Sequence, residues 1–517
     1  MELWNYIQIL GQERQGWWLA RKDNLENRLI ALDQILEKGT LYSIQHLIPY
    51  LKDPNSDIRN RTYHVITQLF ENITSKKEYY NALKHCDISK SDIDYYQQTF
   101  SNEECVVLYS IASLNSKGFV REKAVKYLTD SKNEKAIPFI IYRLADWVEQ
   151  VRKVALQGIE NYKKNEFVNG LVKNLPLFEW IKSVQRADLS AVHSEIMDFV
   201  LVEHGDYLNE YFASFSDDVR ITIAKKMVIV TEIEVDKLSI LLNDKNFIVR
   251  SIALCHFDKL TQHQIDCLLI DKSPQVRLKT LHRLKDHPNF VEIVYPFLMD
   301  RSRSIRELAR YSLKHSVDDF ARIYNDKLLN NESVISSLYG LAETDGKKFV
   351  NSIIPFLDSP KAKVKKAAFL ALSGLDESRA YDYALSNLDS EHAGIRKLVV
   401  AFLSNYKTTD VLQKAREVYK YGNDDLKKSI LLLFSNIGKW QVIADIMLGT
   451  VDENANIRQI SMVYLRQWIN KAPSYFVMPQ QEDLERANTV FEFAFKIHEQ
   501  KKYFEKNPLS GIDFYLR

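Results

Sequence analysis

The chain has 517 residues, of which 70 are Lys or Arg and 68 are Asp or Glu, so its formal net charge is only +2. This balance excludes a globally basic nucleic-acid binder and a strongly charged disordered chain. With only 15 Gly and 12 Pro, the sequence also has too few turn-forming residues for a turn-rich β protein, and it favours helices joined by short polar turns.

Residues 1–20 are predicted to form an N-terminal capping helix. The segment carries apolar side chains at Trp4, Ile7 and Leu10, followed by Trp17 and Trp18. It lacks the basic stretch and apolar core of a secretory signal, and no apolar run in the chain approaches the roughly 20 residues needed to cross a bilayer as a helix. We expect this helix to cover the first repeat of a cytoplasmic protein that has no membrane association.

Residues 21–470 repeat a pattern in which Val or Ile precedes a basic residue, as in Ile58-Arg59, Val249-Arg250 and Ile305-Arg306. Weaker copies fill the gaps between the clear ones, and neighbouring copies are about 31 residues apart on average. The marker positions are residues 28, 59, 90, 121, 152, 186, 220, 250, 277, 306, 335, 365, 396, 427 and 458.

Each copy predicts a helix A, a short polar turn and a helix B. Apolar residues follow each marker at helical spacing, and a proline stands ten residues before it in four copies, at Pro49, Pro176, Pro296 and Pro355. We expect these prolines to kink helix A rather than end it. Because one helix pair cannot bury its own apolar face, successive pairs must stack.

With an Asp six residues before the marker in six copies, this pattern resembles the HEAT-repeat family in its short bacterial form. The resemblance covers about residues 20–470. It implies an all-α fold, a right-handed α-solenoid (superhelix) of about fifteen two-helix repeats. Copies around Lys90, Arg186 and Ile335 depart from the pattern, and residues 75–102 are the hardest to phase.

Residues 471–517 are predicted to form a C-terminal capping helix and a tail. The helix is expected over 482–504, where Leu484, Phe491 and Ile497 supply an apolar face after Pro473 and Pro479. A bare terminal repeat would expose its stacking face, which the helix would cover. The aromatic tail at residues 514–515 is expected to dock on the body or on a partner.

The most regular charged feature is a ladder of Asp and Arg residues, one pair in each of six repeats. Because catalysis needs one unusual constellation, a feature repeated in identical form indicates scaffolding, with Asp capping helix B and Arg bridging to its own or the neighbouring turn. The ladder consists of Asp53 and Arg59, Asp146 and Arg152, Asp244 and Arg250, Asp271 and Arg277, Asp300 and Arg306, and Asp452 and Arg458.

No motif in the sequence indicates catalysis, a cofactor or a metal. The segment with Cys255, His256, His263 and Cys267 is the densest group of metal-ligating residue types. However, adjacent residues on a helix point about 100° apart, and zinc requires four convergent ligands. Phosphate-loop and nucleophile motifs are missing. We therefore predict a protein that is not an enzyme and needs no cofactor or metal.

One enzymatic alternative remains open. A group of DNA glycosylases that excise alkylated bases also uses HEAT-like repeats, with Trp, Asp and Arg on a basic concave face. This chain has Trp147, Trp180 and Trp440, but they fall in different repeats without a shared concave phase, and the chain is much longer than those enzymes. The resemblance to them is therefore weaker than the resemblance to binding scaffolds.

Exposed positions on the B helices form a candidate partner surface. In three late repeats, paired cations recur at the marker and the residue after it, and in earlier repeats His282 and Tyr311 occupy the exposed position five residues past the marker. We call the cations the basic row: Lys365, Lys366, Arg396, Lys397, Lys427 and Lys428.

The basic row predicts an acidic partner, most plausibly a protein, docking along residues 360–430. Nucleic acid is disfavoured because the overall charge is near zero. The leading hypothesis is a scaffold or adaptor. A stoichiometric inhibitor, such as the immunity protein of a toxin, and a HEAT-like nucleic-acid enzyme remain as alternatives, and the oligomeric state stays open.

Overall fold

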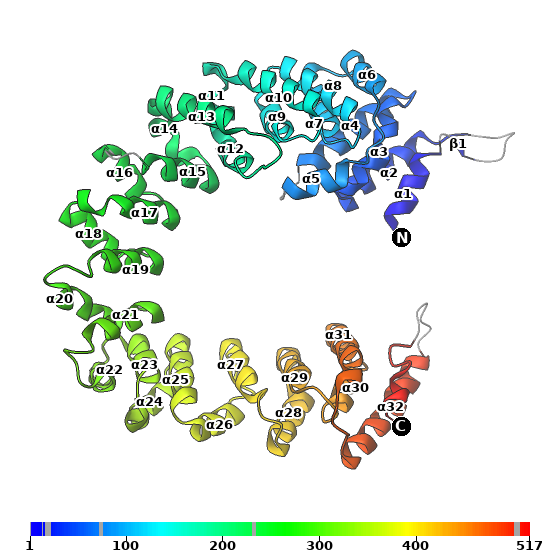
Figure 1. Ribbon diagram of the computed structural model, residues 1–517. Helices are drawn as coiled ribbons and strands as arrows, with labels where there is room; N and C mark the ends of the chain where they lie inside the picture. Colours follow the sequence, from blue (N-terminus) through cyan, green and yellow to red (C-terminus); the bar gives the residue numbers. More distant parts are fainter. Residues whose placement is uncertain are drawn as a thin grey trace. The chain divides into compact units, whose positions relative to one another are not determined.

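The computed structural model describes residues 2–12, 14–15, 22–71, 76–229, 234–500 and 507–516. Within these ranges the chain is helical, apart from an antiparallel ribbon in which β1 (Arg14–Gln15) pairs with β2 (Lys22–Asp23). The predicted all-α solenoid fold is confirmed (Figure 1). The contacts divide the chain into two units, Met1–Thr280 and Leu281–Arg517. The sequence, in contrast, predicts one continuous repeat domain over 21–470.

Unit 1 is a stack of helix pairs around a continuous apolar core that runs from Leu10 to Ala253. Successive B helices pack on one another, for example α2 on α4 and α8 on α10. Its helices are α1 (Glu2–Leu10), α2 (Leu25–Lys38), η1 (Leu41–Ser43), α3 (Ile44–Leu47), η2 (Ile48–Lys52), α4 (Ser56–Glu71), α5 (Lys76–Leu83), α6 (Lys90–Thr99), α7 (Asn102–Ala112), α8 (Gly118–Asp130), η3 (Glu134–Ala136), α9 (Ile137–Leu144), α10 (Glu149–Tyr162), η4 (Asn165–Phe167), α11 (Val168–Lys173), α12 (Leu175–Ile181), α13 (Ser190–Asp198), η5 (Phe199–Glu203), α14 (Gly205–Tyr211), η6 (Phe212–Ser214), α15 (Asp217–Met227), α16 (Val235–Leu242), α17 (Phe247–Ala253), η7 (Leu254–Lys259), α18 (Gln262–Leu269) and α19 (Pro274–Arg283), which ends in unit 2.

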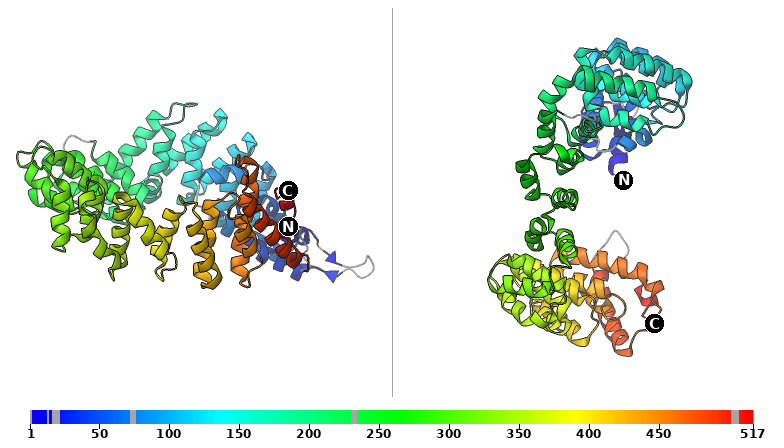
Figure 2. Two further views of the ribbon diagram at one scale, coloured as in Figure 1. Left: turned by 90° about the horizontal axis from the view of Figure 1, so that it is seen from below. Right: turned by 60° about the vertical axis from the view of Figure 1, so that its left-hand side comes forward.

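Unit 2 repeats the same plan. Figure 2 shows its yellow and orange helices following one another in a row, and α25, α27, α29 and α31 pack on each other in that order. Its helices are α20 (Phe290–Val294), η8 (Tyr295–Met299), α21 (Arg303–Leu313), α22 (Phe320–Leu329), α23 (Val334–Ala342), η9 (Lys347–Phe349), α24 (Val350–Ile353), η10 (Ile354–Asp358), α25 (Ala362–Leu375), α26 (Glu377–Ser386), α27 (Ala393–Leu403), α28 (Thr409–Tyr421), α29 (Asp424–Ile437), α30 (Ile443–Gly449), α31 (Ala455–Lys471), η11 (Ala472–Ser474), α32 (Gln481–Gln500) and η12 (Ile512–Phe514).

The predicted repeat register holds along both units except at three markers: Lys90 is the first residue of its helix, Ile335 is the second residue of α23, and Arg186 lies outside a helix. Most marker residues are the fourth residue of a helix B, as Arg59 is in α4 and Arg250 is in α17. Even the weak copy at Lys90 begins a helix, α6. Arg186 does not: it lies in the loop 182–189 between α12 and α13. The structure thus corrects the register at this repeat.

Three of the four prolines kink helix A without ending it, as predicted from their missing N–H group. At Pro49, Pro296 and Pro355, an α-helical segment passes directly into the 3₁₀ turns η2, η8 and η10. At Pro176 the prediction is wrong, because α11 ends at Lys173 and the proline lies in the first turn of a new helix, α12.

The N-terminal segment differs from the predicted helix over 1–20. Helix α1 ends at Leu10, where the backbone N–H groups of Gly11 and Gln12 turn back to the carbonyls of Gln8 and Ile9. Glycine costs more than other ordinary residues in a helix interior, which explains the stop. Residues Trp17 and Trp18 lie outside the described residues. The shortened helix still packs on α2 and buries Leu10.

At the C-terminus, α32 begins within one residue of the prediction and packs on α30. The two aromatic residues of the tail differ in their surroundings. The Tyr515 ring lies 5.9 Å from the Trp468 ring, whereas Phe514 is exposed. The tail therefore docks on the body through Tyr515, and its own residues Leu509 and Ile512 are also buried.

Candidate partner-binding pocket in unit 1

The ladder arginines have two kinds of partner. First, each guanidinium donates to the backbone carbonyl six residues earlier, in the turn before its own helix. Arg250, for example, donates to Asp244 O at 2.7 Å. The same bond is made by Arg59 to Asp53, Arg152 to Asp146, Arg277 to Asp271, Arg306 to Asp300, and Arg458 to Asp452, at 2.6 to 2.8 Å.

Second, the Asp carboxylate accepts a basic side chain from the preceding repeat. Arg121 and Arg220 bind Asp146 and Asp244, each at 2.7 Å, and Arg250 binds Asp271 at 2.7 Å. Arg28 pairs with Asp53 and Lys427 with Asp452 in the same way. These five turns are thereby tied both to their own helix B and to the repeat before it.

The predicted capping role of the Asp residues needs correction. Their Oδ1 atoms accept the backbone N–H two residues later, as Asp244 does from Asn246 at 2.6 Å and Asp452 from Asn454 at 2.9 Å. The N-cap of α17 is Asn246 and that of α31 is Asn454. The Asp lies two residues too early to cap, so it closes the turn that precedes the cap.

The ladder is interrupted at the repeat that contains Arg186. The position six residues before Arg186 holds Trp180, at the end of α12, instead of Asp. Arg152 accordingly donates only to the carbonyls of Asp146 and Trp147 within the described residues. Arg186 lies over the Trp147 ring at 3.9 Å from its centroid and donates to Ala145 O at 3.3 Å.

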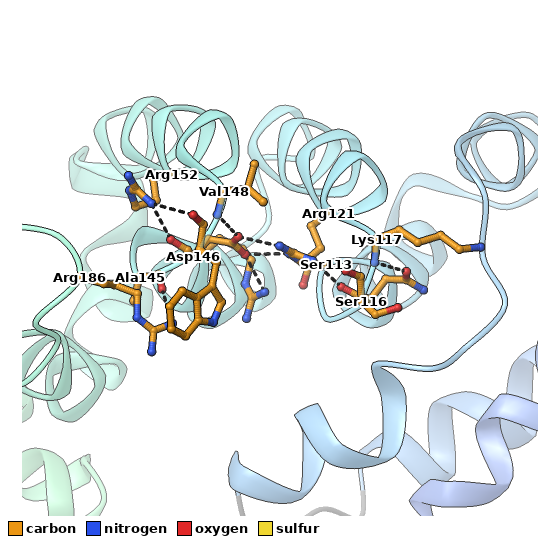
Figure 3. Close-up of polar contacts among 12 residues, drawn as sticks. Ser113, Ser116, Lys117, Arg121, Ala145, Asp146, Val148, Arg152 and Arg186 are labelled. Atoms are coloured by element: carbon orange, nitrogen blue, oxygen red, sulfur yellow. Dashed lines mark hydrogen bonds and ion pairs between the residues drawn. The ribbon is translucent and has the colours of Figure 1, made fainter.

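A cavity of about 900 Å³ opens at this interruption. It is lined by residues of α5, α8, α9 and α12, of the turns that follow α7 and α9, and of the loop 182–189, and Figure 3 shows Arg186 beside the Asp146 turn. Its aromatic walls are Trp147, which is 75% exposed, Trp180, which is 41% exposed, and Tyr142. Exposed tryptophans in a concave site are typical of binding pockets.

Trp147 and Trp180, for which the sequence predicts no shared concave phase, line this one cavity. The phase assigned to Trp180 relied on Arg186 as a helix marker, but the following helix starts only at Ser190. The longer loop brings α12 and the turn after α9 to the same cavity. Trp440 lies elsewhere, in unit 2, and packs against Trp468 at 5.3 Å.

The carboxylate of Asp146 at the edge of the cavity is fully committed. Oδ1 accepts Arg121 Nη2 at 2.7 Å and the Val148 N–H at 2.9 Å, and Oδ2 accepts Arg121 Nε at 2.8 Å and Arg143 Nη1 at 2.9 Å. Although burial opposes ionisation, these bonds lower the pKa of Asp146 below its usual value. The group is a structural anion with no lone pair left for acid–base chemistry.

No protein-family model matches the sequence, and no curated protein matches it. Structures that resemble it include Kap121p (TM-score 0.34, 10% identity, 96% of this chain and 64% of that one) and Kap95p studied with RanGDP (0.29, 9%, 100% and 67%). A homology model of the AP-3 complex is a further example (0.22, 13%, 95% and 97%). The chain spans 64% of the length of the Kap121p chain, and similarity at this level assigns no function.

The structure separates the members of the basic row. Arg396 is buried and donates to the carbonyls of Ser390 and Glu391 at 2.7 and 2.9 Å, so it belongs to the ladder rather than to the surface. Lys427 pairs with Asp452 at 2.8 Å. Arg396 and Lys427 are therefore removed from the set of candidate partner-binding residues, because their charges are used inside the solenoid.

The remaining cations of the basic row reach the surface to different degrees. Lys397 is exposed, and Lys365 and Lys366 are half-buried. The Lys366 ammonium lies directly against Gly394 of the next repeat, where a β-carbon would clash with it. Lys428 forms an ion pair with Asp425 at 3.3 Å. Acidic side chains thus stand among these lysines, and the row is less positive than its sequence suggests.

Two further candidates lie apart from the row. Tyr311 on α21 is 68% exposed and has the Lys314 ammonium 4.5 Å from its ring centroid, and His282 on α19 is exposed. In the cysteine–histidine segment, Cys267 Sγ and His263 Nε2 are 3.8 Å apart, while His256 Nε2 contacts Val228 O at 3.0 Å. No three metal-ligating side chains converge within the described ranges. No described helix is both long and apolar enough to span a membrane.

Sequence reasoning missed the cavity, although a signal for it exists. The intervals on both sides of Arg186 are longer than the average repeat, and Trp180 replaces the Asp of the turn. These two successive intervals are the longest between neighbouring markers, and they single out this repeat.

Proposed function

We propose that the chain is a non-enzymatic scaffold that binds a partner protein, and that the cavity at Trp147 is a principal contact. The observation that supports this is the exposure of Trp147 and Trp180 on one cavity beside Arg186. Trp, Tyr and Arg side chains contribute most of the binding energy at protein interfaces, especially where they line a pocket. A volume of about 900 Å³ also suits the anchor residues of a partner.

The glycosylase alternative gains an aromatic pocket but lacks a free carboxylate. The Asp146 oxygens accept four hydrogen bonds from Arg121, Arg143 and the Val148 N–H. The equivalent Asp in other repeats makes the same turn, which argues for a structural role. We expect no base release from alkylated duplex DNA. Release at a rate above that of an Asp146→Asn variant would favour the enzyme.

Unit 2 offers a second proposed contact, at Lys366, Lys397 and Lys428. The exposed lysines would bind acidic side chains of the partner, with a contribution that falls as salt rises. Whether the protein acts as a scaffold or as a stoichiometric inhibitor depends on what the partner does when bound. Both roles use the same surfaces.

The proposal can be tested by site-specific photo-crosslinking in the native cell. A benzophenone amino acid placed at Trp147 should form a covalent adduct with one discrete protein, which mass spectrometry would identify. The matched control is the same residue at Phe476, which is 96% exposed in unit 2 and lies outside residues 360–430. Adducts that are identical at both positions, or the absence of any adduct at Trp147, would contradict the proposal.

A further inference from the structure

The cavity holds more arginines than carboxylates. Arg121, Arg143 and Arg186 line it, and Asp146 is the acidic residue of its lining. Arg121 is fully used, since it binds Asp146 through two nitrogens and the carbonyls of Asn115 and Ser116 through the third. One carboxylate therefore balances the charge of one arginine, and two positive charges remain.

Arg143 carries one of these charges in a buried position. Its side chain donates a single hydrogen bond, from Nη1 to Asp146, and its buried Nε has no hydrogen-bond partner within the described part of the chain. Burial lowers the pKa of Arg143, against the opposing effect of Asp146, and the neighbouring Arg121 lowers it further. A buried, incompletely paired guanidinium is costly unless an anion joins it.

Arg186 carries the second charge at the cavity mouth. It is exposed, and within the described residues its contacts are the Trp147 ring and the Ala145 carbonyl. Stacking on the indole fixes the plane of the guanidinium while leaving its N–H donors available, the geometry in which arginine binds carboxylates. The cavity thus presents one buried and one exposed cation toward the same space.

Besides its arginines, the cavity has an apolar surface. The Tyr142 and Trp180 rings lie 5.6 Å apart, and with Trp147 and Leu177 they form a surface suited to an aromatic side chain. In an extended peptide, side chains two residues apart project from the same face, about 6.6 Å from one another. One short segment can therefore place an aromatic ring and a carboxylate in the cavity together.

We propose that this cavity binds an extended segment of the partner protein in which an Asp or Glu lies two residues from an aromatic residue. The carboxylate would accept hydrogen bonds from Arg143 and Arg186, and the ring would pack on Trp147, Trp180 and Tyr142. This inference rests on the proposed function, because it names the partner chemistry of the same pocket.

The test is isothermal titration of the full chain with three blocked peptides. They are Ac-Ser-Glu-Ser-Phe-Ser-NH2, a matched peptide with Gln in place of Glu, and a matched peptide with Ala in place of Phe. We expect saturable binding of the first peptide and binding at least about tenfold weaker for the other two. Raising NaCl from about 50 mM to about 500 mM should weaken the first peptide and leave the Gln peptide unchanged.

Variants of the chain locate the binding. Arg186→Gln and Trp147→Ala should each weaken the Glu–Phe peptide at least about tenfold, whereas Arg301→Gln, an exposed arginine in unit 2, should not. Arg143→Gln tests the buried cation. Because that change can also lower stability, its thermal melt is recorded, and Arg186→Gln carries the test if it unfolds.

Three results would overturn the inference: no saturable peptide binding at millimolar concentration, equal binding of the Glu and Gln peptides, or displacement of the peptide by an oligothymidylate that binds more tightly. The two proposals fail separately. If the crosslinked partner depends on Trp147 but none of the peptides bind, the protein-binding function stands and the peptide chemistry is wrong. If the peptide binds but the partner ignores Trp147, the proposed function is wrong.

Discussion

Two turns of unit 1 show how one repeat can serve the fold and another can serve binding. At Arg220, the guanidinium is completely buried and binds Asp244, Asp217 and the Phe215 carbonyl. At Arg186, the position in the next turn that would supply this carboxylate holds Ser214, and the guanidinium lies on the surface over Trp147. The same kind of side chain is structural where the ladder continues and accessible where it stops.

The contrast predicts its largest effect on stability. Arg220→Ala should lower the free energy of unfolding of unit 1 by about 3–5 kcal/mol, because it leaves the buried Asp244 without its partner. Arg186→Ala should change it by less than about 0.5 kcal/mol, since the residue is exposed. Urea unfolding monitored by circular dichroism measures both. Equal losses of unfolding free energy for the two variants would contradict the assignment of Arg220 to the fold and of Arg186 to the surface.

A milder loss is expected at Arg250, which is slightly exposed and binds Asp271 and the carbonyl of Asp244. Arg250→Ala removes charge-assisted bonds worth about 1.5–3 kcal/mol and should lower the melting temperature. The measurement is a thermal melt beside a partner-binding assay. An unchanged melt with abolished binding would assign this arginine to the partner surface instead of to the ladder.

Much of this fold could be predicted from the sequence because its information is periodic. A basic residue in the first turn of each helix B, such as Arg59 or Arg306, fixes the register wherever the apolar spacing agrees. The end of α1 at Leu10 was missed because the apolar pattern continues past Gly11, so only the glycine signals the stop. The sequence did not reveal that the charges of Arg396 and Lys427 are used inside the repeats, because the exposure of a side chain in a helix turn depends on the neighbouring repeats.

The cavity could not be predicted from the register itself. When one repeat pattern is fitted to fifteen copies, a copy that differs from the others is read as a weak copy. Arg186 was therefore assigned as the marker of a helix B. Its true position depends on the loop 182–189 and on which side of α12 Trp180 faces, both of which are set by packing against α9. The cavity at this irregular repeat can be recognised only in the three-dimensional stack of repeats.

Acid should reduce the contribution of the ladder carboxylates. Hydrogen bonds from Arg121 and Val148 lower the pKa of Asp146, despite its burial, so its contribution to stability is present above the unfolded value of about 4 and is lost as pH falls through the folded pKa. The stability difference between wild type and Asp146→Asn should therefore shrink as pH falls below about 4. Unfolding free energies across that range test it, and a constant difference would contradict it.

The smallest effect on stability is expected in the basic row. Lys366→Glu, Lys397→Glu and Lys428→Glu should each change the unfolding free energy by less than about 0.5 kcal/mol, because none of the three lysines is buried. Together they should weaken binding of an acidic partner and reduce its sensitivity to salt. Lys153→Glu, at an exposed lysine on α10, is the matched control. Intact binding with unchanged salt sensitivity in the triple variant would remove unit 2 from the interface.

The most direct test of the central claim is the affinity of the crosslinked partner for wild type, Trp147→Ala and Phe476→Ala, measured with purified proteins. Both positions carry highly exposed aromatic rings, so the two variants differ chiefly in whether the ring lines the cavity. The pocket predicts that Trp147→Ala raises Kd at least about tenfold while Phe476→Ala leaves it within about twofold. Equal Kd values for the two variants would contradict a binding role for the cavity.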